Sequence, residues 1–270
     1  MEQGRARERR SQLIAGVGRD AAAWAAGAAP IVLIIALWHG IAVSGLAPPA
    51  LLPKPATVFL RVAEQLRNPL FLENAGITLL SLFSGFAIAV IVGVGLGLAA
   101  TASRVVAVLL RPLIRVLAPI PKIALYPALI LLLGFDHSSK VALVVADAVF
   151  PILLAAWHGM ASVEPKLVWS ARAAGASPWR CLLTVVLPAA LPSILTGCRV
   201  GLVIACIVVF LAEMISSTDG LGNVLVRAAR NFQTVDMFVP IIAISALGLT
   251  LNLGFNALRA RLLAGFPEED

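Results

Sequence analysis

Ionisable side chains that interrupt long apolar stretches are the residues of this sequence best placed to do chemistry. Asp147, Arg199 and Glu213 each lie inside such a stretch. A charge in lipid is costly, so residues of this kind commonly mark the path of a solute or ion. All three are therefore candidates for a translocation path. For Asp147 the alternative is structural hydrogen bonding, and for Arg199 and Glu213 it is a side chain that reaches the membrane surface.

Motifs that would indicate an enzyme are missing from the sequence. It has no Gly-x-x-x-x-Gly-Lys-Ser/Thr loop to hold phosphates, no His-Glu-x-x-His pair and no Ser/His/Asp order typical of a hydrolase. The cysteines and histidines fit no zinc spacing, and the cysteines are not placed for a structural disulfide. We therefore expect no catalytic residues, no metal and no cofactor bound by this chain.

Composition indicates an all-α integral membrane protein. Of its 270 residues, 60% are hydrophobic and 13% are charged, and the mean hydropathy is +0.96. A helix needs about 20 apolar residues to cross a bilayer, and runs of this kind predict about six spans. The spans are 21–43, 74–101, 112–134, 139–160, 193–216 and 236–258. Pro119, Pro121 and Pro127 interrupt the third, which predicts a kink or a re-entrant start.

Lys and Arg residues orient these spans. If the N-terminus is cytosolic, fifteen of the 21 Lys and Arg residues, Lys122 among them, fall on the cytosolic side. The positive-inside rule therefore places both termini in the cytosol. Helix ends and a basic arm beside anionic lipid account for the net charge of +7. Membrane lipid, and no nucleic acid, is the expected partner. A cleaved signal peptide within residues 1–47 is an alternative.

The same features divide the chain into segments. Residues 1–20 are a basic cytosolic arm, and residues 21–73 hold the first span and an external amphipathic helix at about 56–68. Residues 74–258 form the membrane core, followed by a cytosolic tail at 259–270. Within the core, Gly93 and Gly97 have the GxxxG spacing that favours close packing of helices.

Residues 161–192 are the longest polar segment inside the core and predict two short helices joined by an elbow. Gly175 suits the left-handed conformation that ends a helix. Ser177 suits an N-cap, and Pro178 suits the first turn of the next helix. A rigid cytosolic elbow of this kind could transmit a push from another protein into the membrane bundle. An ordinary hairpin that shields the bundle is the alternative.

This segment resembles the cytoplasmic EAA loop of ABC-importer permeases, E-A-A-x-x-x-G-A-S followed by L-P-x-x-x-P. The residues that match are Ala171, Gly175, Ala176, Ser177, Leu187, Pro188 and Pro192. Trp169 stands at the glutamate position, and Ser170 replaces the first alanine. The resemblance implies that the loop contacts an ATPase. The expected coupling residues are Trp169, Ala171, Arg172, Ala173, Gly175, Ala176, Ser177 and Pro178.

Further motifs over about residues 50–262 are similar to the permease branch that serves aliphatic sulfonates, taurine and nitrate. They are Leu52-Pro53-Lys54-Pro55, Arg111-Pro112, Pro119-Ile120-Pro121, Gly134-Phe135, Ser139-Lys140, Phe150-Pro151-Ile152-Leu153, Ala212-Glu213, Gly220-Leu221-Gly222 and Ala229-Arg230-Asn231-Phe232-Gln233-Thr234. The resemblance implies a type I ABC-importer permease in a bacterial cytoplasmic (inner) membrane, with a path for a small anionic solute. A carboxylate such as Asp147 would repel a simple anion.

The same resemblance implies the partners. They are two cytosolic ATPase subunits that carry ATP and Mg, a second permease copy that usually makes a homodimer, and an extracytoplasmic solute-binding protein. An ATPase-independent secondary transporter or channel would also explain the spans and Asp147, although it would leave the elbow unexplained. A membrane scaffold without solute flux is a third possibility.

Overall fold

The computed structural model describes residues 29–48, 50–216, 218–264 and 266, and all regular structure in these ranges is helical. The chain divides into two compact units, Met1–Arg61 and Val62–Asp270. The predicted basic arm, the first part of the first predicted span and the last residues of the tail lie outside the described residues.

The described part of the first unit contains one apolar helix, Ala29–Ser44, and the beginning of α2 (Pro55–Gln65). Trp38 Nε1 donates a hydrogen bond to the carbonyl oxygen of Pro53 at 3.1 Å, which fastens the Pro-rich linker to the apolar helix. Over its described residues this helix is shorter than the other spans. The predicted amphipathic helix at 56–68 is confirmed as α2, with somewhat different ends.

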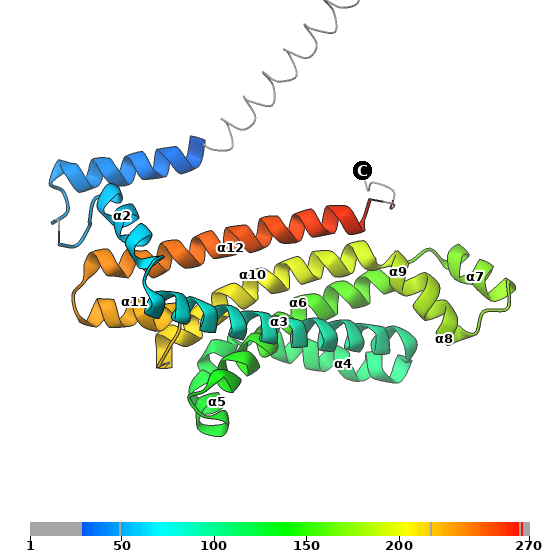
Figure 1. Cartoon of the computed structure of the whole chain (residues 1–270). Coiled ribbons are helices and arrows are strands. Elements are labelled where there is room, and N and C mark those ends of the chain that lie inside the picture. The colour runs from blue at the N-terminus through cyan, green and yellow to red at the C-terminus, as the bar shows by residue number, and fades with distance from the viewer. Residues whose placement is uncertain (1–28, 49, 217, 265, 267–270) are drawn as a thin grey trace, which may run out of the picture. The chain divides into compact units, whose positions relative to one another are not determined.

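Three long helices form the core of the second unit. They are α3 (Pro69–Ala102), α6 (His137–Ala161) and α10 (Leu191–Ser216), which pack side by side (Figure 1). α3 begins earlier than the predicted residue 74, because Asn68 caps it and Pro69 occupies its first turn. The Asn68 side chain accepts from the backbone N–H of Leu70 at 3.1 Å. Buried apolar side chains from all three helices fill one continuous core.

Small residues on α3 allow this close packing. A Cβ at Gly93 would lie 2.9 Å from Cγ2 of Ile152, and one at Gly97 would lie 2.9 Å from Cβ of Ala156. Both distances are too short for a side chain to fit without a shift of the neighbouring helix. The prediction that the GxxxG spacing marks a packed face is confirmed, and the face belongs to the contact between α3 and α6.

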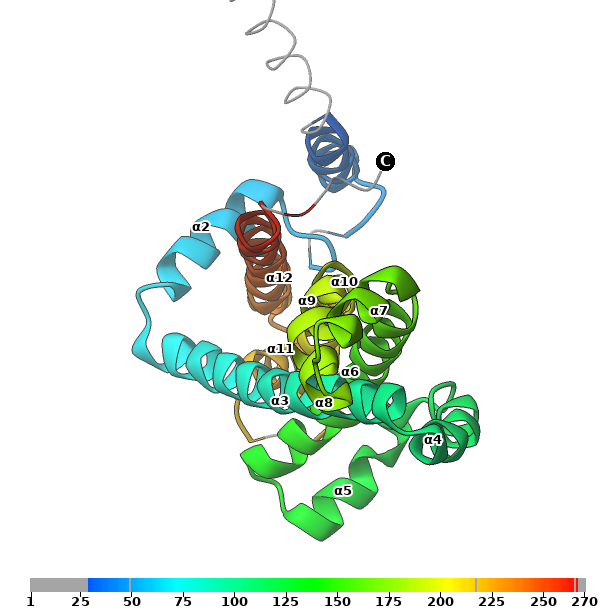
Figure 2. The same cartoon turned by 90° about the vertical axis from the view of Figure 1, so that its right-hand side faces the viewer.

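The third predicted span, 112–134, is broken, as its prolines predict. α4 (Arg104–Leu117) runs alongside α3, and a 3₁₀ turn (Lys122–Leu125) then leads into α5 (Tyr126–Leu133). The two halves are bent by 84° (Figure 2). Pro119 and Pro121 lie between them, and each lacks the N–H that a continuing helix would need. The predicted break is confirmed, but the helix before it begins at Arg104.

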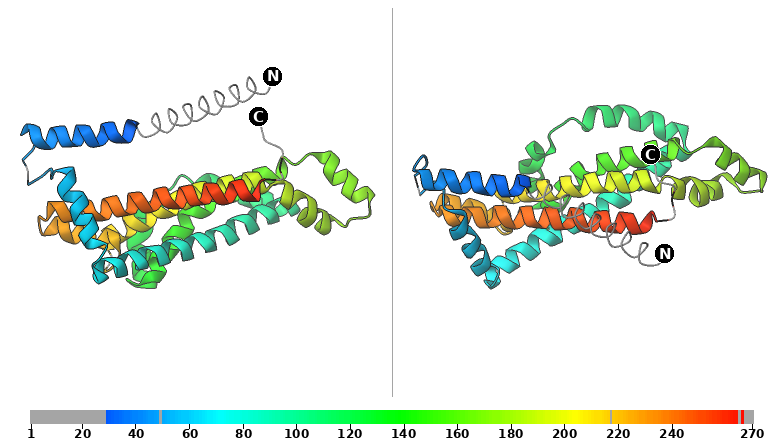
Figure 3. Two further views of the ribbon diagram at one scale, coloured as in Figure 1. Left: turned by 45° about the horizontal axis from the view of Figure 1, so that its top comes forward. Right: turned by 90° about the horizontal axis from the view of Figure 1, so that it is seen from above.

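Two further parts complete the second unit. At one end, α7 (Pro165–Ala173) and α8 (Pro178–Cys181) lie beyond the bundle (Figure 3). A π-helical turn (Leu182–Val186) and α9 (Leu187–Ala189) lead back into α10. At the other end, α11 (Leu221–Arg230) precedes α12 (Thr234–Leu262). We call these two ends the elbow end and the network end, the latter for the polar contacts described below.

Within the described residues, four helices are long and apolar enough to cross a membrane, and the bent pair makes five. The sequence predicts about six. The difference is the first span, whose described residues, Ala29–Ser44, are too few to be counted and whose predicted residues 21–28 lie outside the described ranges.

Candidate functional site

The elbow has the geometry that the sequence predicts. Gly175 has a φ of +84°, in the left-handed region where a β-carbon is penalised. Its N–H donates to the carbonyl of Arg172 at 2.9 Å, and the N–H of Ala176 donates to the carbonyl of Ala171 at 3.0 Å. These two bonds make a Schellman motif, which satisfies the last carbonyls of α7 and turns the chain sharply.

The next helix begins at once. The Ser177 hydroxyl accepts from the N–H of Arg180 at 3.3 Å, and Pro178 occupies the first turn of α8. The predicted N-cap and first-turn roles of these two residues are therefore confirmed. Because both helix ends are capped within three residues, the turn has little freedom to bend.

Both helices of the elbow present indole rings to the outside. The Trp169 side chain on α7 is 67% exposed and Trp179 on α8 is 58% exposed. Ala173 is also exposed, whereas Ala171 and Ala176 are half-buried. Trp179 is not among the predicted coupling residues, although its place just after the N-cap could have indicated it. Large exposed aromatic side chains of this kind are typical of surfaces that bind another protein.

Between the elbow and the bundle lies a pocket of about 430 Å³. Val168 and Arg172 of α7 line it, together with Trp179 and Cys181 from the α8 side and Met160 of α6. The elbow is therefore partly separated from the bundle by this pocket, although Val168 packs against the core.

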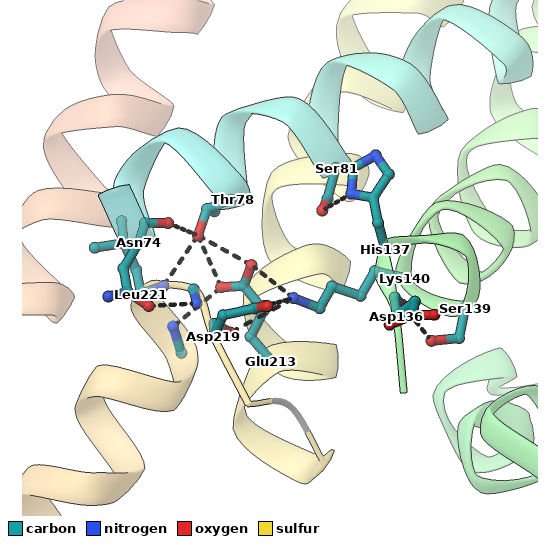
Figure 4. A network of polar contacts seen from close by, with 12 residues as sticks. Asn74, Thr78, Ser81, Asp136, His137, Ser139, Lys140, Glu213, Asp219 and Leu221 are labelled. Carbon is teal, nitrogen blue, oxygen red and sulfur yellow. Dashed lines mark hydrogen bonds and ion pairs between the residues drawn. The ribbon is translucent and has the colours of Figure 1, made fainter. Parts of the chain in front are cut away.

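A buried polar network occupies the network end of the bundle (Figure 4). Glu213 of α10 is 1% exposed, and its carboxylate accepts from the Thr78 hydroxyl at 3.0 and 2.9 Å and from the N–H of Gly222 at 3.1 Å. The ammonium of Lys140 on α6 lies 3.9 Å from the same carboxylate and contacts the carboxylate of Asp219 directly. The alternative in which Glu213 reaches the membrane surface is wrong, because its side chain is enclosed.

The loop before α11 is fastened to the same network. Asn74 Oδ1 accepts from the N–H of Gly220 at 2.7 Å, and the Thr78 hydroxyl oxygen accepts from the N–H of Leu221 at 3.0 Å. Gly220 has a φ of +95°, and a Cβ there would lie 2.1 Å from Cδ of Glu213. Only glycine allows the backbone to pass this close to the carboxylate.

His137 extends the polar contacts along α3. Its Nδ1 is 2.8 Å from the Ser81 hydroxyl and its Nε2 is 3.2 Å from the Ser84 hydroxyl (Figure 4 shows the first of these). The network as a whole joins α3, α6, α10 and the start of α11. Glu213, Thr78 and Lys140 are buried and contact one another, so their arrangement stabilises the network end rather than leaving these three groups free for a solute.

A second ion pair lies between the two ends. Lys122 Nζ is 3.3 Å from Oδ1 of Asp147, near the middle of α6. Lys122 also donates to the carbonyl of Ala118 at 2.9 Å and lies 4.5 Å from the centroid of the Phe150 ring. The assignment of Lys122 to the cytosolic side is therefore wrong. α4 carries the chain away from the elbow end before the bend, so Lys122 lies at the depth of the middle of α6.

Arg199 has a third environment. Its Nε donates to Oδ1 of Asn252 on α12 at 2.9 Å, so the side chain reaches across to another helix rather than to a membrane surface. The three candidates of the predicted path thus lie in three separate places, and the structure does not bring them together. Within the described residues no group of His, Cys, Asp or Glu could hold a metal, and the three cysteines are free and buried.

A family model and two curated relatives, compared with this chain, agree with one another. The family model described as "Binding-protein-dependent transport system inner membrane component" matches residues 89–265. The aliphatic sulfonates transport permease protein SsuC of Bacillus subtilis (strain 168) is 30% identical over 91% of this chain and 89% of its own length. The taurine transport system permease protein TauC of Escherichia coli (strain K12) is 31% identical over 86% of each chain.

Solved structures agree on the fold. A chain of the MetNI methionine ABC transporter in an inward-facing conformation has a TM-score of 0.56 at 19% identity, and covers 76% of this chain and 96% of that one. A chain of an amino acid ABC transporter has a TM-score of 0.57 at 21% identity, with 75% and 95% covered.

These matches carry no support for an ATPase-independent transporter or channel, and they place ATP hydrolysis in a partner subunit rather than in this chain. This chain belongs to the family of binding-protein-dependent transport system inner membrane components, the multi-pass permease subunits of ABC importers.

Proposed function

We propose that this permease imports a small sulfonate-like solute across a bacterial cytoplasmic membrane. Relatives named for aliphatic sulfonates and for taurine share about 30% identity with it along most of both chains. The solute would reach the permease from an extracytoplasmic binding protein, as the family description implies. The elbow end would face the cytosol, in agreement with the excess of Lys and Arg at that side of the spans.

The observation that carries the coupling mechanism is the doubly capped turn at Gly175. When an ATPase dimer closes on ATP and Mg, it must push an element that does not bend. The elbow fits this requirement because the Schellman motif and the Ser177 cap fix both sides of the turn. The proposed coupling residues are Trp169, Ala171, Arg172, Ala173, Gly175, Ala176, Ser177 and Pro178, and we add Trp179.

The proposed assembly contains two copies of this chain and two ATPase subunits. In the described residues, the bent segment presents an apolar face that nothing in one copy covers: Leu131 is 87% exposed and Leu132 is 80% exposed. A second copy or lipid would cover this face. A path between two copies would then run beside the bend, where Asp147 lies.

Of the three predicted path candidates, we propose a direct role for Asp147 only. Glu213 and Arg199 have structural roles in this proposal. Glu213 holds the start of α11 to α10, and Arg199 joins α10 to α12. Neither side chain needs to contact the solute in order to hold the helices that surround the path.

The solute is tested by growth and uptake of a deletion strain on single sulfur or nitrogen sources: taurine, simple alkanesulfonates, nitrate and a pyrimidine precursor. We expect a defect confined to sulfonates, restored by the wild-type gene on a plasmid. Normal uptake of every sulfonate, in a strain without a second sulfonate importer, would contradict the proposed solute class.

A further inference from the structure

The backbone at the bend indicates where water enters the membrane region. Residues 118–121 are not helical, and Pro119, Ile120 and Pro121 are exposed. Irregular backbone at membrane depth is tolerated only where protein covers it or where it faces water. Lys122, the next residue, places a charge at the same spot. Transporters commonly have their solute sites where a membrane helix is broken, and here an ion pair lies beside the break.

In the described residues, the carboxylate partners of Lys140 and of Lys122 differ in how completely they are satisfied. In the network, the Glu213 carboxylate accepts hydrogen bonds from the Thr78 hydroxyl and from the N–H of Gly222, and its side chain is fully enclosed. The Asp147 side chain is 22% exposed, and within the described residues its ion-pair partner is Lys122. The Lys122–Asp147 pair therefore retains carboxylate surface for a further partner.

Exposure within the pair restricts what that partner can be. The Asp147 side chain is more exposed than that of Lys122, at 22% against 9%. A simple anion approaching from the open side would meet the carboxylate first and be repelled. A cation alone would satisfy Asp147 but would displace Lys122 and leave its ammonium unpaired, which is costly in a buried site. A solute that carries both charges satisfies both groups.

We infer that the Lys122–Asp147 pair is a transient site for a zwitterionic amino-sulfonate on the translocation path. The ammonium of the solute takes the place of Lys122 at the Asp147 carboxylate, and its sulfonate accepts hydrogen bonds from the displaced Lys122 ammonium. The flexible stem of lysine allows this exchange without movement of the helix. The inference rests on the proposed function and narrows its solute class from sulfonates in general to those with an amino group.

The test is equilibrium binding of radiolabelled taurine to the purified permease–ATPase complex without the binding protein, so that only the membrane site selects. Ethanesulfonate, which lacks the amine, and ethylamine, which lacks the sulfonate, serve as competitors. Each single-charge competitor should compete about tenfold or more weakly than unlabelled taurine, because it leaves one charged group unpaired. Saturable taurine binding that both competitors displace as well as taurine does, or no saturable binding to a complex that retains its ATPase, would overturn the inference.

Three variants separate a binding pair from a structural one. Asp147→Asn should reduce taurine affinity to about that of ethanesulfonate, and Lys122→Gln should abolish binding of both. The double variant Lys122→Gln/Asp147→Asn contains no unpaired charge, so a purely structural pair predicts that it binds like the wild type, whereas our inference predicts that it does not bind. Glu73→Gln, which removes an exposed carboxylate at the start of α3, is the matched control and should bind taurine normally.

These outcomes are distinguishable from failure of the proposed function. If the complex forms and sulfonates are imported but taurine binds no more tightly than ethanesulfonate, the zwitterion site is contradicted. The proposed function is then unaffected. If no ATPase accompanies the chain and no sulfonate defect is found in the deletion strain, the proposed function itself fails.

Discussion

Two lysines in this permease differ in how completely the protein encloses their carboxylate partners. Lys140 is 1% exposed and lies against two carboxylates, Glu213 and Asp219, whose other contacts hold the network end together. Lys122 has one carboxylate partner among the described residues, and that partner is partly open. We therefore assign a structural role to the first lysine and a role in solute binding to the second.

Lys140→Met should strongly destabilise the protein, because it leaves a buried carboxylate without its counter-charge. Breaking a buried ion pair from one side costs about 3–5 kcal/mol. The loss should be seen as a lower melting temperature and a lower yield of the monodisperse protein in mild detergent. Lys54→Met, at an exposed lysine, is the matched control and should melt as the wild type does. An unchanged melting temperature for Lys140→Met would show that the network is not needed for stability.

At the scale of single residues, the sequence indicates which charges are unusual but not what they contact. The cost of a charge in lipid is enough to identify Asp147 and Glu213. Their partners come from elsewhere in the chain: Thr78 lies 135 positions from Glu213. Contacts between residues so distant in sequence depend on the packing of whole helices, which no local pattern contains. The contact of Lys122 with Asp147, which contradicts its predicted cytosolic place, depends on helix packing in the same way.

At the scale of elements, the sequence predicts features that depend on neighbouring residues. It does not predict features that depend on how helices pack. The elbow could be predicted because a Schellman glycine, an N-cap serine and a first-turn proline act within a few residues of one another. The break after α4 follows from its prolines, but its angle of 84° does not. α11 was missed. Its buried Leu221, Leu225 and Ala228 recur at helical spacing, a signal that was present but short.

The contact between α3 and α6 gives an element-scale prediction with an internal control. Gly97→Leu should separate the two helices, because even a Cβ at this position would lie 2.9 Å from Cβ of Ala156. Gly95 lies on the same helix and a Cβ there would meet no atom within 4 Å, so Gly95→Leu should be tolerated. Overpacking of a well-packed contact costs about 1–3 kcal/mol. Thermal melting of the two variants in detergent measures the difference, and equal melting temperatures would contradict the described packing.

At the scale of the whole second unit, two structurally distinct ends are joined by a tightly packed bundle. The elbow lies beyond α6 and α10 at one end, and the polar network fastens α3, α6, α10 and α11 at the other (Figures 1 and 4). In the proposed mechanism, a push at the elbow would be delivered to helices that are fixed together at their far ends. Such a bundle tilts as a body more easily than it deforms, which is what alternating access requires.

The coupling of this motion to ATP is the central claim, and co-purification with the ATPase from mild detergent tests it most directly. Gly175→Val and Gly175→Asn form the decisive pair, because valine is strongly disfavoured at a φ of +84° whereas asparagine tolerates it. We predict that the wild type and Gly175→Asn retain the ATPase and ATP-dependent uptake of taurine, and that Gly175→Val loses both while remaining folded. A wild-type permease that never carries an ATPase, or a Gly175→Val variant that keeps both activities, would contradict the account.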